Sequence, residues 1–191
     1  MELSSILGTM LSEDSVKNIS KAAGVTPEKV QRVLGSGLPS LLNGALAQAR
    51  GGDTAEGFLG ALKQHAGGDL SNLGAFLGKV DLGDGAKIVG HLLGQNSGAV
   101  QEISNASGVS QKDTGSILAA AAPLLMSLLG QQTGSQQGQS ASAVSGMLGG
   151  LLSNVDMGSM IMGLLGSGGA SSGSQGKPAG GILGALGGLL K

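Results

Sequence analysis

The sequence predicts an all-α fold, a multihelical array of two related helix-turn-helix units with a Gly-rich flexible C-terminal tail. Three observations favour it. Apolar residues recur at helical spacing along most of the 191 residues. Residues 16–48 and 100–132 align without a gap, with ten identities in 33 positions. Phe58 and Phe76 are the sole aromatic residues, and a core of small aliphatic side chains suits helix-on-helix packing better than a β-sandwich.

The first two helices are predicted from apolar spacing and capping residues. Residues 3–11 carry leucine, isoleucine and methionine at the spacing of a short amphipathic helix. Ser12 suits the N-cap of a second helix, which runs to about Ala23. Gly24 then supplies the left-handed conformation that ends it.

The third helix has the strongest start signal in the chain. Thr26, Pro27 and Glu28 are typical of an N-cap, a proline in the first helical position and an acid in the first turn. Pro39 lies inside this helix, so we expect a kink, or a break near Gly37. A Gly-Gly pair ends this first unit.

Shorter helical segments fill the middle of the chain. Residues 53–66 predict a helix that turns Phe58, Leu59 and Leu62 inward. Two brief apolar segments follow, at residues 70–77 and 82–93, separated by Gly-Asp turns.

The second unit repeats the pattern of the first. We expect a helix over residues 98–107, a stop at Gly108 and an N-cap at Ser110. A long apolar helix then runs to about residue 131, with Pro123 in the position that corresponds to Pro39.

The composition also predicts the organisation of the chain. Residues 1–132 form the helical domain, with its internal repeat at 16–48 and 100–132. Residues 133–142 are a Gln/Ser/Gly linker, 143–166 short Gly/Leu/Met helices, and 167–191 a low-complexity tail with an apolar end. The large aliphatic residues of that end form a candidate interaction surface: Ile182, Leu183, Leu186, Leu189 and Leu190.

Several short stretches carry a resemblance to a known family. They are residues 90–94 (GHLLG), 106–109 (ASGV), 122–126 (APLLM), 11–13 (LSE) and 24–25 (GV). With them, residues 1 to about 132 resemble the YidB-like family of bacterial proteins, a family described as a domain of unknown function. These are packing motifs, so the resemblance implies an all-helical array without a known catalytic site.

Residues 19–34 present an alternative function. This segment resembles the helix-turn-helix of lactose-repressor-type regulators, in which the start of the second helix enters the DNA major groove. Lys29 and Arg32 are the candidate nucleic-acid contacts. However, a proline and an acid precede Lys29, and Ser116 stands in the place of Arg32 in the second unit. The pattern therefore favours a packing unit over a DNA reader.

Groups able to support catalysis or metal binding are sparse. His65 and His91 have no second histidine or cysteine three or four residues away, and the aspartates at 69, 81 and 84 are typical of turns and N-caps. The chain has no cysteine. We therefore expect no enzyme, cofactor, metal site or small-molecule substrate.

Net charge and hydropathy predict what the protein binds and where it is located. The net charge of −1 argues against a surface built for phosphates. No basic signal region and no run of 18 apolar residues is present, so a cytoplasmic location is expected. We expect an interaction or structural module that binds a protein partner or self-associates. The tail either docks on a helix groove, another copy or a membrane surface, or packs loosely on its own domain.

Overall fold

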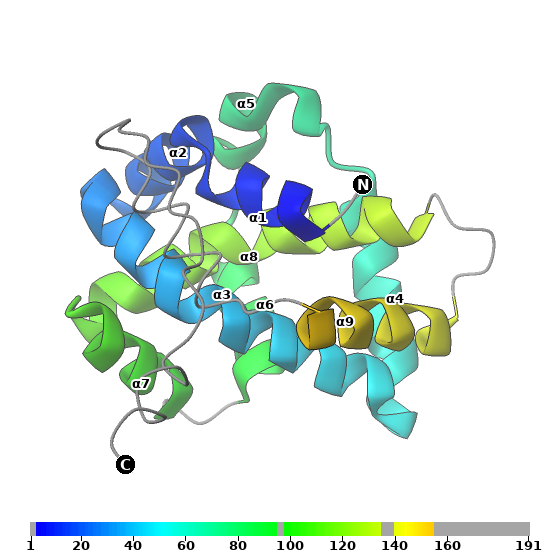
Figure 1. Ribbon diagram of the computed structural model, residues 1–191. Helices are drawn as coiled ribbons and strands as arrows, with labels where there is room; N and C mark the ends of the chain where they lie inside the picture. The colour runs from blue at the N-terminus through cyan, green and yellow to red at the C-terminus, as the bar shows by residue number, and fades with distance from the viewer. Residues whose placement is uncertain (1–2, 95–97, 135–139, 155–191) are drawn as a thin grey trace, which may run out of the picture.

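The computed structural model describes residues 3–94, 98–134 and 140–154. Within these ranges the chain forms nine α-helices and one short 3₁₀ helix, and no strand (Figure 1). The elements are α1 (Leu3–Leu11), α2 (Glu13–Ala23), α3 (Pro27–Arg50), α4 (Gly52–Ala66), η1 (Leu70–Asn72), α5 (Leu73–Leu77), α6 (Leu82–Leu93), α7 (Gly98–Ser107), α8 (Gln111–Gly134) and α9 (Ala141–Asn154). The predicted all-α class is confirmed.

The ends of the helices follow the local signals in the sequence. The Ser12 hydroxyl accepts a hydrogen bond from the Ser15 amide at 3.3 Å, which caps α2. Gly24 and Gly108 end α2 and α7 with φ values of 67° and 65°. The Ser110 hydroxyl accepts from the Asp113 amide at 3.2 Å at the start of α8.

Helix α8 is the centre of the core. Every residue from 117 to 130 is buried. By length and composition, Gln111–Gln132 is the one helix among the described residues that could cross a membrane, and 83% of its most apolar window is buried inside the fold. A helix that is apolar on all sides is expected where other helices surround it, and that burial accounts for its composition.

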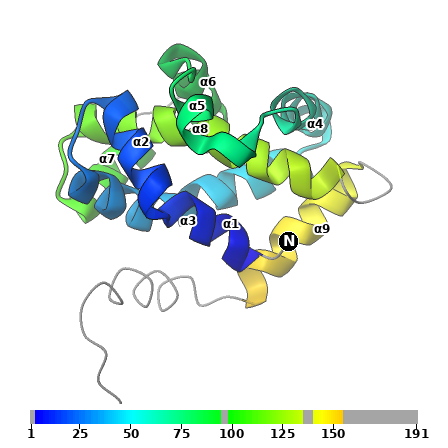
Figure 2. The ribbon, with the colours of Figure 1, turned by 90° about the horizontal axis from the view of Figure 1, so that it is seen from above.

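The other helices pack around α8 from several sides. Helices α1, α2, α4, α6 and α7 all contact it, while α7 and α9 lie against α3. Seen from above, α8 crosses the middle of the molecule, with α2 and α7 at one end and α4 at the other (Figure 2). Residues 16–48 thus pack on residues 100–132: α2 lies on α8, and α3 lies on α7.

Helix α6 approaches its neighbours at two glycines. A Cβ on Gly85 would overlap the carbonyl oxygen of Ala119 in α8, and a Cβ on Gly44 in α3 would overlap the carbonyl oxygen of Leu92. Pro123 has no amide hydrogen, so the carbonyl of Ala119 lacks its usual donor four residues on. Glycine is therefore required where α6 crosses both long helices.

Helix α3 excludes one of the two outcomes expected at Pro39. It is continuous from Pro27 to Arg50, so the break near Gly37 does not occur, although Pro39 lies inside it. Gly37 and Leu38 are buried, and a Cβ on Gly37 would contact Leu118 at 3.0 Å. Packing on both sides of the proline offsets the missing backbone hydrogen bond.

The C-terminal part of the chain is also more helical than expected where it is described. Helix α8 continues to Gly134, and α9 begins at Ala141, so the predicted linker is shorter within the described ranges. Val144 and Leu148 of α9 are buried in the core beside α3. The predicted tail at residues 167–191, with its apolar end, lies outside the described residues.

Candidate functional site

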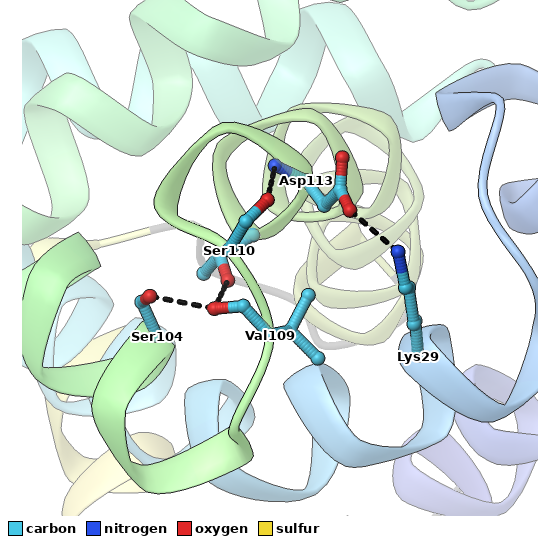
Figure 3. A network of polar contacts seen from close by, with 6 residues as sticks. Lys29, Ser104, Val109, Ser110 and Asp113 are labelled. Carbon is cyan, nitrogen blue, oxygen red and sulfur yellow. Dashed lines mark hydrogen bonds and ion pairs between the residues drawn. The ribbon is translucent and has the colours of Figure 1, made fainter.

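The segment at residues 19–34 places Lys29 against the start of α8. Its Nζ donates to Oδ2 of Asp113 at 2.8 Å, and the side chains of Lys29 and Asp113 are 39% and 26% exposed. Figure 3 shows the pair beside the N-terminal cap of α8, with Ser104 donating to the carbonyl of Val109 at 2.6 Å. Lys29 therefore joins α3 to α8.

Arg32 lies on the exposed side of α3, one turn after Glu28. The pKa of Glu28 is lowered chiefly by a hydrogen bond from its own backbone amide, then by the Thr26 hydroxyl, with a smaller contribution from Arg32. The face that a DNA reader would present thus carries an acid beside Arg32. The geometry adds no support to the nucleic-acid hypothesis.

The Lys29–Asp113 pair predicts a weak acid dependence of stability. The Lys29 hydrogen bond, more than any other cause, holds the pKa of the Asp113 carboxyl below its usual value. A lowered folded-state pKa contributes stability above the unfolded pKa, and that stability is lost as pH falls through the folded pKa. Asp113→Asn should be slightly less stable than the natural chain at pH 7, and the two should converge below about pH 4.

Thermal melts from pH 7 to pH 2.5 measure this difference. The difference in melting temperature between the two chains at pH 7 should narrow in high salt, because the Lys29–Asp113 pair is partly exposed to solvent. A gap that stays constant across the whole pH range would assign the effect of the substitution to something other than the carboxylate charge.

A polar cleft of about 620 Å³ lies between α4, α5 and α6 over Pro123 of α8. His65 Nε2 and Asp84 Oδ2 are 3.7 Å apart in its wall. Asp69 caps η1 by accepting from the Ser71 amide at 3.0 Å, and Asp81 caps α6 by accepting from the Gly83 amide at 2.7 Å. The N-cap roles expected for Asp69 and Asp81 are therefore confirmed.

The chemistry available in this cleft is limited. The pKa of Asp69 is lowered by the hydroxyl and then by the amide of Ser71, both of which hydrogen-bond its carboxylate. In the described ranges, no three His, Asp or Glu side chains are grouped as a metal ion would need. The cleft thus has one His–Asp contact, and its neighbouring carboxylates bind backbone amides.

A second hollow, which we call the α4–α6 pocket, is smaller and more apolar. Its volume is about 310 Å³. Its lining comes from the end of α3, from α4 and α6, and from α8: Gln48, Thr54, Gly57, Phe58, Ala61, Ile88, His91, Leu92 and Met126. Phe58, Ile88, Leu92 and Met126 of the lining are all buried members of the hydrophobic core.

Two polar side chains at this pocket donate to backbone carbonyls. Gln48 Nε2 donates to the carbonyl of His91 at 2.7 Å, and Thr54 Oγ1 donates to the carbonyl of Gln48 at 3.1 Å. His91 is exposed in the last turn of α6. Gly57 is exposed, and a Cβ added there would meet nothing within 4 Å. The pocket is open at Gly57 and offers apolar contact.

Sequence reasoning placed Phe58 and Leu62 in the core correctly, since both are buried, and Leu59 is half-buried. It did not find the α4–α6 pocket, whose members come from four helices distant in sequence. The available signal was local: Gly57 and Ala61 flank Phe58 at helical spacing, so small side chains lie beside a large one on the same face of α4.

The candidate interaction surface Ile182, Leu183, Leu186, Leu189 and Leu190 lies outside the described residues.

Residues 5–132 match a family described as a bacterial protein of unknown function (DUF937). No curated protein matches the chain. No solved structure matches it either. Because the family match covers most of the chain, the protein belongs to the DUF937 family.

Proposed function

We propose that this member of the DUF937 family is a non-enzymatic interaction module whose α4–α6 pocket takes apolar side chains of a protein segment. The observation that carries the proposal is the pocket itself: Phe58, Ile88, Leu92 and Met126 line a hollow of about 310 Å³ that is open at Gly57. Ligand pockets begin at about this size. A hollow at this lower limit suits one or two aliphatic side chains.

The bonding of the polar groups supports a binding role over a chemical one. Gln48 and Thr54 use their donors within the protein, so the pocket holds a ligand by burial of apolar surface. In the polar cleft, Asp69 and Asp81 cap helices. These contacts favour the α4–α6 pocket as the functional site.

We further infer that the scaffold behind the pocket consists of two related units that interlock. Helices α3 and α8 begin 84 residues apart, at Pro27 and Gln111, and end at the same separation. The Lys29–Asp113 ion pair joins two residues with this same separation. Because the short helix of each unit packs on the long helix of the other, α6 and α8 are held in place by both units.

A fluorescent apolar dye, 8-anilinonaphthalene-1-sulfonate, tests the proposed site. The full chain should bind it saturably, and Gly57→Leu should weaken this binding by about tenfold, because a leucine fills the space that one bound side chain would occupy. Gly60→Leu is the matched control. It changes the same helix one turn on, at an exposed glycine with nothing within 4 Å and outside the pocket lining.

Thermal melts of all three chains accompany the titration, because dye also binds to loosened cores. Equal dye affinity in Gly57→Leu and Gly60→Leu, with cooperative melts, would show that the α4–α6 pocket is not the binding site.

A further inference from the structure

The chain carries a segment of its own that matches the α4–α6 pocket. Between Lys177 and Lys191 the sequence has no charged residue. Five large aliphatic residues stand in this stretch, with glycine or alanine between them: Ile182, Leu183, Leu186, Leu189 and Leu190. A pocket lined mostly by apolar side chains, in which Gln48 and Thr54 donate to backbone carbonyls, favours a segment of this kind.

The described part of the chain ends in α9, on the side of α8 away from α6 (Figure 2), so the tail must pass around the molecule to reach the pocket. Helix α9 packs on α3 and α4, two of the four helices that line the pocket. A Cβ on Gly149 would lie 3.0 Å from Nη2 of Arg50, two residues after Gln48 of the pocket. The last described residue, Asn154, follows one turn later.

The chain beyond α9 is long enough to reach the pocket. About 27 residues separate Asn154 from Ile182, and they reach at most about 90 Å when fully extended. A domain of this size is roughly 40 Å across. A tether of this kind keeps its end at an effective concentration near the millimolar range, far above a micromolar second copy. The geometry therefore favours the chain's own tail over the tail of another molecule.

We propose that residues 180–190 of this chain occupy the α4–α6 pocket of the same molecule, with leucine side chains beside Gly57 and Met126. This inference rests on the proposed function, since it requires the pocket to accept apolar side chains. A partner that uses the pocket must displace the tail, so the tail acts as an internal competitor.

Cysteine cross-linking in the full chain tests this placement, because the natural sequence has no cysteine. Gly57→Cys is combined with Leu186→Cys, and the rate of disulfide formation with oxidised glutathione is measured at micromolar protein. The control combines Gly98→Cys with Leu186→Cys. Gly98 is exposed, with nothing within 4 Å of an added Cβ, and it begins α7, which lies away from α4 in both views (Figures 1 and 2).

The Gly57 pair should close at least about tenfold faster than the Gly98 pair, to a monomeric product and at a rate independent of protein concentration. Equal rates for the two pairs would overturn the placement. Disulfide-linked dimers that dominate and grow with concentration would assign the tail to a second copy and overturn the intramolecular proposal.

A second full-length variant separates this inference from the proposed function. Changing Leu183, Leu186, Leu189 and Leu190 to serine should raise the dye affinity of the pocket several-fold, because the competitor is removed. If the serine variant and the natural chain bind dye with equal affinity, and both lose that binding when Gly57→Leu is added, only the tail placement is wrong. If neither shows binding that depends on Gly57, the proposed function fails as well.

Discussion

Gly85→Ala is expected to lower the free energy of unfolding by about 2–4 kcal/mol, the cost of forcing atoms into a packed contact less a small gain in helix propensity. The added methyl group would overlap the carbonyl oxygen of Ala119 in α8. That oxygen belongs to backbone, so neither α6 nor α8 can relieve the overlap by a side-chain rotation. The midpoint of thermal unfolding should fall by roughly 4–16 °C.

Gly90→Ala is the matched control, because it lies in the same helix and an added Cβ there meets nothing within 4 Å. Its melt should be unchanged or higher, with a gain of at most about 1 kcal/mol from helix propensity. Equal melting temperatures for the two variants would mean that α6 does not cross α8 as closely as the contact at Gly85 requires.

Residues 1–52 expressed alone are expected not to fold. This fragment contains α1, α2 and α3, but α2 packs on α8, and α3 packs on α6, α7 and α9, all of which it lacks. Val30 and Leu34 are completely buried in the full chain and would lose part of their cover in the fragment. At about 25 cal/mol per Å², the apolar surface lost exceeds what so small a chain can spare.

Circular dichroism and size-exclusion chromatography measure this outcome. The fragment should show little helix and no cooperative melt, or it should aggregate, while the full chain melts cooperatively. A monomeric fragment with a cooperative transition would contradict the interlocked arrangement of the two units.

The helices could be predicted from the sequence because their ends depend on neighbouring residues. Ser12 caps α2, and Gly24 and Gly108 take the left-handed conformation, each within a few residues of the pattern that predicted it. The absence of a break at Pro39 could not be predicted. Gly37 is buried where α3 passes Leu118 of α8, a residue distant in sequence.

The candidate site could likewise be predicted only in part from the sequence. The burial of Phe58 could be predicted from its spacing in α4, because helical periodicity is local. The pocket could not, because Phe58 meets Ile88 and Met126 only after α6 has crossed both long helices. The sequence also assigned Lys29 to a possible nucleic-acid surface, without a means of placing it beside Asp113.

The most direct test of the α4–α6 pocket is the methyl spectrum of methionine-labelled full-length protein during a titration with the dye. Met126 lines the pocket, whereas Met10 is equally buried in α1 and is not part of the lining. We expect the Met126 methyl signal to move saturably, with the same midpoint as the fluorescence, while the Met10 signal stays in place. A Met126 signal that does not move while the dye binds, or that moves no more than Met10, would contradict a binding function for this pocket.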